Sequence, residues 1–181
     1  MVSLARLSRI WRFRRDQAGV SAVEFALILP LMLALFFGGA ELSDALTINR
    51  KVSHVTSALS DLVTQSKSLS DADMSNILDA ASAVITPYST SNLKIKVTQI
   101  KIDATSKATV SWSDARNDTP LTVGATVTTI PSALLVANSY LIMTEVHYSY
   151  KPTIGYVMTG TFDLTDKFYL RPRVSDFVAR T

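Results

Sequence analysis

Residues 14–40 read RRDQAGVSAVEFALILPLMLALFFGGA, and this stretch decides how the chain is organised. Two arginines lead into Gly19, and residues 20–40 then carry no charged side chain except Glu24. A helix of that length rises about 30 Å at ~1.5 Å per residue, which matches the hydrocarbon core of a bilayer. The composition therefore predicts a membrane-spanning helix over residues 20–40.

The single carboxylate inside this apolar run requires an explanation. Placing Glu24 in lipid costs on the order of 2–3 kcal/mol even on lenient insertion scales. A basic leader, then a glycine, then a glutamate five residues later is typical of a type IV prepilin-like processing site. We interpret the bond between Gly19 and Val20 as the cleavage site and residues 1–19 as a leader that is removed.

Two other interpretations of the N-terminus stay open. An ordinary signal peptide would use residues 25–37 as its apolar region and would be cut after Gly38-Gly39-Ala40. An uncleaved anchor would keep every residue. Neither alternative gives Glu24 a role, whereas the processing-site interpretation uses Gly19, Glu24 and the unbroken helix that follows.

The positive charge of the chain is concentrated in the leader. The formal net charge is +3 over 181 residues. Residues 41–181 hold 13 basic and 13 acidic side chains, so they contribute no net charge. Positive residues beside an apolar span stay cytoplasmic, which predicts that residues 41–181 are exported and argues against nucleic-acid binding. The leader arginines that set this topology are Arg6, Arg9, Arg12, Arg14 and Arg15.

The helical pattern continues beyond the apolar run. Neither proline nor glycine occurs in residues 41–66, and apolar side chains recur there at spacings of three and four. This predicts one helix over residues 20–66, whose exported part, residues 41–66, packs an apolar stripe against a domain. Pro30 removes one backbone hydrogen bond inside the span, which predicts a kink. The stripe consists of Leu42, Ala45, Ile48, Val52, Val55, Leu59 and Leu62.

Residues 67–181 read as an exported α+β domain. Ser70 and Asp73 predict the start of a short second helix that ends before Pro87. Its predicted apolar face is Met74, Ile77, Leu78, Ala81, Val84 and Ile85.

Alternation with a period of two follows this second helix. It begins at Leu93 and slips in phase before Ile100, which predicts a strand with a bulge. Residues 108–112 predict its hairpin partner, and residues 140–150 and 161–171 predict two more strands. The polar residues 113–129 predict an exposed loop. The fold class is thus α+β: a long N-terminal transmembrane helix that continues outside the membrane, a short second helix and an antiparallel sheet of about four strands, as in pilins.

The sequence offers no chemistry typical of an enzyme. His54 and His147 are its two histidines, and neither has the spacing of a metal ligand. No serine stands in a Gly-x-Ser-x-Gly turn, and no glycine-rich phosphate loop occurs. We therefore predict no catalytic residue, no metal, no cofactor and no small-molecule substrate.

Residues 19–41 resemble the TadE-like family, minor pseudopilins of the tight-adherence (Flp-type) pilus machinery. Glu24-Phe25-Ala26-Leu27, Pro30 and Gly39-Ala40-Glu41 carry this resemblance. The C-terminal half adds to it through Ile130-Pro131, Tyr140-Leu141-Ile142, Glu145-Val146, residues 148–152, Gly155 and residues 169–173.

The resemblance implies a minor pseudopilin of a bacterial inner membrane, with its N-terminus cytoplasmic, its domain periplasmic and possible incorporation into a pilus. A prepilin peptidase would cut between Gly19 and Val20, and Glu24 and Phe25 would serve assembly. Partners would be other minor pilins and the inner-membrane pilus platform proteins. Major pilins of this class are very short, so the large exported domain favours a minor subunit. The alternative is an unprocessed, membrane-anchored periplasmic scaffold or binding module of the same apparatus.

Overall fold

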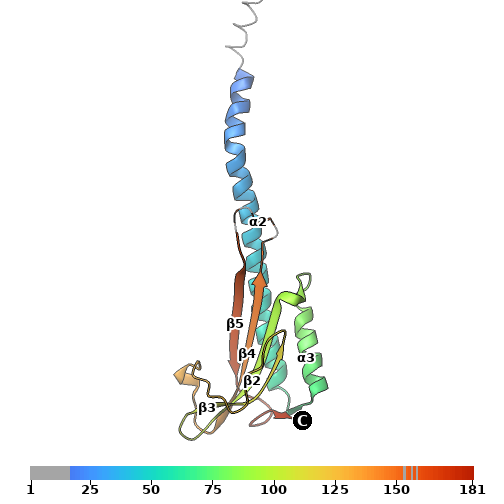
Figure 1. Cartoon of the computed structure of the whole chain (residues 1–181), viewed down its shortest axis with the longest axis vertical. Helices are drawn as coiled ribbons and strands as arrows, with labels where there is room; N and C mark the ends of the chain where they lie inside the picture. The colour runs from blue at the N-terminus through green and yellow to red at the C-terminus, as the bar shows by residue number, and fades with distance from the viewer. Residues whose placement is uncertain (1–16, 153, 156, 158) are drawn as a thin grey trace, which may run out of the picture.

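The computed structural model describes residues 17–152, 154, 155, 157 and 159–181, and Figure 1 shows their arrangement. One long helix, α2 (Gln17–Thr64), projects from a domain that contains a shorter helix, α3 (Asp71–Ala83). Short 3₁₀ turns occupy Thr90–Asn92 and Ser132–Leu134. The strands are β1 (Ser68–Leu69), β2 (Leu93–Ile102), β3 (Ala108–Arg116), β4 (Ser139–Tyr150), β5 (Phe162–Leu170) and β6 (Ala179–Arg180).

Helix α2 runs for 48 residues without a break and ends two residues before the predicted Ser66. Pro30 lies inside it, and the helix continues on both sides of that residue; the kink stays a prediction. The N-terminal half of α2 stands clear of the domain, whereas the C-terminal half packs on β4, β5 and α3 (Figure 1).

The buried stripe of α2 differs from the predicted stripe at both ends. Ile48, Val52, Val55, Leu59 and Val63 are fully buried, whereas Leu42 and Leu62 are exposed. At ~100° per residue, position 41 falls on the centre of the stripe and position 42 falls well to one side of it. At the other end, the domain covers the side of the stripe that carries Val63. The prediction is therefore wrong for Leu42 and Leu62.

Four strands form an antiparallel sheet in the order β3-β2-β4-β5, which confirms the predicted α+β class and the β2–β3 hairpin. The register of β2 against β3 shifts between Gln99 and Ile100, where the alternation slips in the sequence. β4 pairs with β2 on one side and with β5 on the other. The larger core lies between the two helices and this sheet.

The predicted loop over residues 113–129 is wrong at its start. Ser113–Arg116 continue strand β3, and Thr126 forms a bridge to Thr109. Ile130, which follows this segment, packs with buried residues of β2, β3 and β4 in a second, smaller core. This core lies at the end of the sheet that contains the β2–β3 turn. Its buried members are Ile100, Ile102, Ala108, Ile130, Leu141 and Met143.

Helix α3 begins as predicted. The Ser70 hydroxyl accepts the backbone N–H of Asp73, and the Asp73 carboxylate accepts the backbone N–H of Ser70, so both halves of a capping box are present. Met74, Leu78, Ala81 and Ile85 are buried. Val84 is exposed, against prediction, because the helix ends at Ala83 and the chain turns there.

Candidate functional site

The N-terminal half of α2 displays a continuous apolar surface. An 18-residue window of this helix has a mean hydropathy of 2.3, and none of that window is buried. Soluble monomers rarely expose contiguous apolar area on this scale. This helix is long and apolar enough to cross a membrane, which suggests single-pass anchoring. Its exposed large side chains are Val20, Val23, Phe25, Leu27, Ile28, Leu29, Leu31, Met32, Leu33, Leu35 and Phe36.

The predicted cleavage bond between Gly19 and Val20 lies in the first turn of the described helix. A Cβ added at Gly19 would meet no atom within 4 Å, so packing does not require a glycine there. Val20 is exposed. The leader arginines Arg6, Arg9, Arg12, Arg14 and Arg15 lie outside the described residues.

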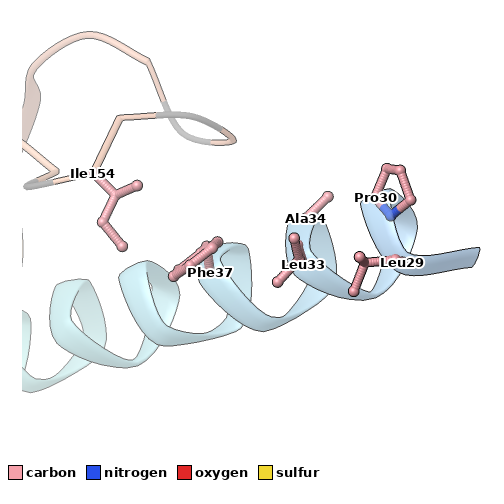
Figure 2. A pocket seen from close by; sticks show the side chains of 6 residues that line it. All are labelled: Leu29, Pro30, Leu33, Ala34, Phe37 and Ile154. Atoms are coloured by element: carbon pink, nitrogen blue, oxygen red, sulfur yellow. The ribbon is translucent and has the colours of Figure 1, made fainter. Parts of the chain in front are cut away.

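Glu24 and Phe25 both lie on the exposed surface of the apolar half. Glu24 follows Val20 by four residues, so the two share one side of the helix. A carboxylate is thus presented one turn from the residue that cleavage would make N-terminal. Further along, Pro30 helps to line an apolar groove with a volume of about 360 Å³ (Figure 2). The other lining residues are Leu29, Leu33, Ala34, Phe37 and Ile154.

The apolar half joins the domain at Glu41, a buried carboxylate with only 3% of the residue exposed. Its Oε1 accepts the backbone N–H of Gly155 at 2.5 Å, and its backbone carbonyl accepts the Tyr150 hydroxyl at 3.3 Å. One turn earlier, a Cβ at Gly38 would approach Val157 to 3.1 Å. The loop between β4 and β5 is therefore fixed against α2 where the apolar half ends.

The sequence pattern predicted no contact for Glu41, which entered only through the family resemblance. A signal was present, because position 41 lies seven residues before Ile48 and shares its side of the helix. An acidic residue on a buried stripe predicts a specific hydrogen-bond donor from another element.

Two other titratable groups, Glu145 and Lys167, join neighbouring strands of the sheet. Glu145 forms an ion pair with Lys167 across β4 and β5. Partial burial opposes the charged form of Lys167, but the hydrogen bond and charge of Glu145 outweigh it and raise the pKa of that ammonium.

The two histidines lie apart and take no part in a cluster. His54 is exposed on α2, and His147 Nδ1 lies 2.9 Å from the Thr165 hydroxyl. Within the described residues, no three His, Cys, Asp or Glu side chains are placed to hold a metal ion.

These features define a class of protein: a long helix suited to a single membrane pass that continues into an α+β domain. The sequence model of the TadE-like protein family matches residues 19–59, which confirms the resemblance over the apolar half of α2 and most of its packed half. Membership of that family implies that a protein takes part in the Tad (Flp-type) pilus machinery as a structural component without enzymatic activity. Comparison with curated proteins and with solved structures gave no match.

Proposed function

We propose that this protein is a minor pseudopilin that acts in assembly of a tight-adherence (Flp-type IV) pilus. A prepilin peptidase matures it by cutting between Gly19 and Val20. The observation that carries the proposal is the division of α2, whose first half presents apolar side chains and one carboxylate while its second half packs one face against the domain. Such a helix can exchange lipid neighbours for helix neighbours while the domain stays folded.

Cleavage gives Glu24 its role. Removing residues 1–19 discards the arginines that hold the N-terminus at the cytoplasmic face. The new ammonium of Val20 pairs with Glu24 of the same chain or of a neighbouring subunit. In apolar surroundings this pair offsets part of the cost of burying each charge, and loss of one partner leaves the other uncompensated. Phe25, beside Glu24, packs on the adjacent helix.

The proposed setting is the bacterial inner membrane, with the domain in the periplasm. The partners are the prepilin peptidase, other minor pilins and the membrane proteins of the pilus platform. The membrane match of α2, the TadE-like segment and the charge of the leader support this placement.

The first test determines the N-terminal residue of the protein purified from its native membrane, by intact mass and peptide mapping. A chain that starts at Val20 is expected. A chain that keeps Met1 would contradict processing and favour the unprocessed periplasmic scaffold. A chain that starts at Glu41 would show signal-peptidase cleavage and release of a secreted domain.

The role of Glu24 is tested separately with Glu24→Ala. We expect normal cleavage but a loss of at least tenfold in co-purification with partner pilins and in pilus number, because the Val20 ammonium loses its partner. Leu31→Ala, another exposed residue of the same half, serves as the control and is expected to assemble normally. Normal assembly of cleaved Glu24→Ala would contradict the pairing.

A further inference from the structure

Ile154 and Val157, in the loop between β4 and β5, present apolar side chains beside α2. No charged residue occurs between Lys151 and Asp163. Ile154 is 50% exposed and Val157 is 48% exposed, although both lie next to other apolar groups. Figure 1 shows this loop at the end of the domain from which the apolar half of α2 emerges.

Two contacts of the loop, and one from Tyr150 at the adjoining end of β4, fix the position of the loop along the helix. Glu41 accepts the Gly155 N–H, the Tyr150 hydroxyl reaches the Glu41 carbonyl, and Val157 packs so closely on Gly38 that a side chain there would press against it. The loop therefore lies level with residues 37–41, the last turn of the apolar half. Figure 2 shows Ile154 directed toward Phe37, with the groove extending along the helix toward Pro30.

Continuity with the apolar half of α2 identifies what covers this surface. If residues 20–40 span a bilayer, residues 37–41 lie at its surface, and so does any group in contact with them. Apolar side chains there gain free energy by leaving water for the outer acyl region. The exposed Lys151, where β4 ends, is placed for its ammonium to reach lipid phosphates.

We propose that the β4–β5 loop is a second membrane contact, in which Ile154 and Val157 enter the lipid interface beside α2 and lipid chains fill the groove along Leu29–Phe37. Glu41 is the residue that positions the loop for this contact. The domain is then held against the bilayer at two points and does not pivot freely on the helix. This contact requires anchoring by α2 but does not depend on cleavage at Gly19.

Single-cysteine labelling tests the proposal directly, because the chain contains no cysteine. Full-length Val157→Cys, labelled with the fluorophore NBD, is placed in vesicles of phosphatidylethanolamine and phosphatidylglycerol. Spin-labelled lipids quench from the membrane, and iodide quenches from water. Leu33→Cys is the reference inside the span. Val123→Cys is the matched control, because this valine is 66% exposed and lies away from the β4–β5 loop. The next residue, Gly124, donates its N–H to Val110 of β3, which places Val123 beside that strand.

We expect NBD at position 157 to be quenched at least threefold more by lipid labelled near the headgroup than NBD at position 123, and to resist iodide. NBD at Ile154→Cys should show the same quenching by lipid and the same resistance to iodide. Two labelled positions guard against a result caused by local distortion at one of them. Glu41→Ala should reduce lipid quenching at position 157, whereas Glu41→Gln, which keeps an acceptor oxygen, should retain it.

Iodide quenching at 154 and 157 as strong as at 123 would overturn the proposal and place the loop in water. Protection from both quenchers would also overturn it, by showing that the loop is covered by protein, either the same chain or a second copy. An absence of lipid quenching at position 33 would refute anchoring by α2 and the loop contact together, while leaving cleavage at Gly19 untouched.

Discussion

Two buried threonines of the sheet show how a hydrogen-bond partner determines whether a buried hydroxyl group stabilises the fold. Thr98 and Thr144 are both fully buried, on neighbouring strands β2 and β4. The Thr98 hydroxyl lies 2.8 Å from the Ser113 hydroxyl, whereas the Thr144 hydroxyl has no hydrogen-bond partner among the described residues. An unsatisfied buried hydroxyl lowers stability, because its desolvation is not compensated.

Replacing each of them with valine is therefore expected to have opposite effects. Thr98→Val should lower the free energy of unfolding by about 1 kcal/mol, because the Ser113 hydroxyl loses one of its two hydrogen-bond partners and keeps only the Leu121 N–H. Thr144→Val should leave it unchanged or raise it by up to ~1 kcal/mol. Urea unfolding of the full chain in detergent, followed by circular dichroism, measures both variants. Equal destabilisation by the two would contradict this assignment.

At the scale of the element, α2 provides a direct comparison of two leucines. Leu59 is fully buried and Leu62 is 45% exposed, although the spacing of apolar residues predicts both on one stripe. Leu59→Ala should lower the free energy of unfolding by about 2–5 kcal/mol, since it removes contacts and leaves a cavity. Leu62→Ala should cost less than about 1 kcal/mol. The same urea titration checks both, and a large effect of Leu62→Ala would show that a partner or packing contact covers it.

The capping box of α3 makes its stability depend on pH. The Ser70 hydroxyl and then the Ser70 backbone N–H bond to the Asp73 carboxylate and lower its pKa below the ordinary 3.8. Since the folded pKa is the lower one, the carboxylate contributes its full stability above pH ~4, and this is lost as pH falls through the folded pKa. Wild type should exceed Asp73→Asn in stability at pH 7, and the difference should shrink below pH ~4. Unfolding titrations at pH 7, 5 and 3 measure this, and a constant difference would exclude the carboxylate as its source.

The sequence predicted the helices and strands where their formation depends on the spacing of neighbouring apolar and capping residues. Period-two runs located β2 and the first part of β3, and the sequence also placed β4 and β5 near residues 140–150 and 161–171. The phase slip located the bulge before Ile100, and Ser70 with Asp73 located the start of α3. Which flank of the α2 stripe is covered depends on where the sheet lies, and periodicity does not contain that information. The position of Glu41 on the stripe predicts that another element supplies a hydrogen-bond donor, but that donor, Gly155, lies 114 positions away, so no local pattern identifies it.

At the scale of the whole molecule, the C-terminal residues 178–180 pack onto the domain, although their sequence shows no helical or strand periodicity. Strand β6 has two residues and pairs in parallel with the two-residue β1. Val178, just before it, is fully buried; its N–H bonds to Gln99 Oε1 at 2.7 Å and its carbonyl accepts the Trp112 indole N–H at 2.9 Å. Strands this short are invisible to pattern reading, because their stability comes from tertiary contacts.

Arg180 completes this closure and yields the last prediction. Its guanidinium binds both carboxylate oxygens of Asp114 at 2.9 Å, the Asp71 carboxylate at 2.7 Å and the Leu69 carbonyl at 2.8 Å. The side chain is only 18% exposed, so these charge-assisted bonds are partly shielded from water.

Arg180→Ala should therefore lower the free energy of unfolding by about 2–3 kcal/mol, because it leaves Asp114 and the Leu69 carbonyl without this donor. Carboxypeptidase should then remove the C-terminal residues faster than in wild type, since β6 detaches from β1. Arg171→Ala removes the same charge from an exposed position and is the control, with an expected cost below ~0.5 kcal/mol. Equal effects of the two variants would mean that net charge, and not the docking of β6, sets the stability of the domain. A selective effect of Arg180→Ala would show that this single side chain joins β3, α3 and the C-terminal strand into one unit.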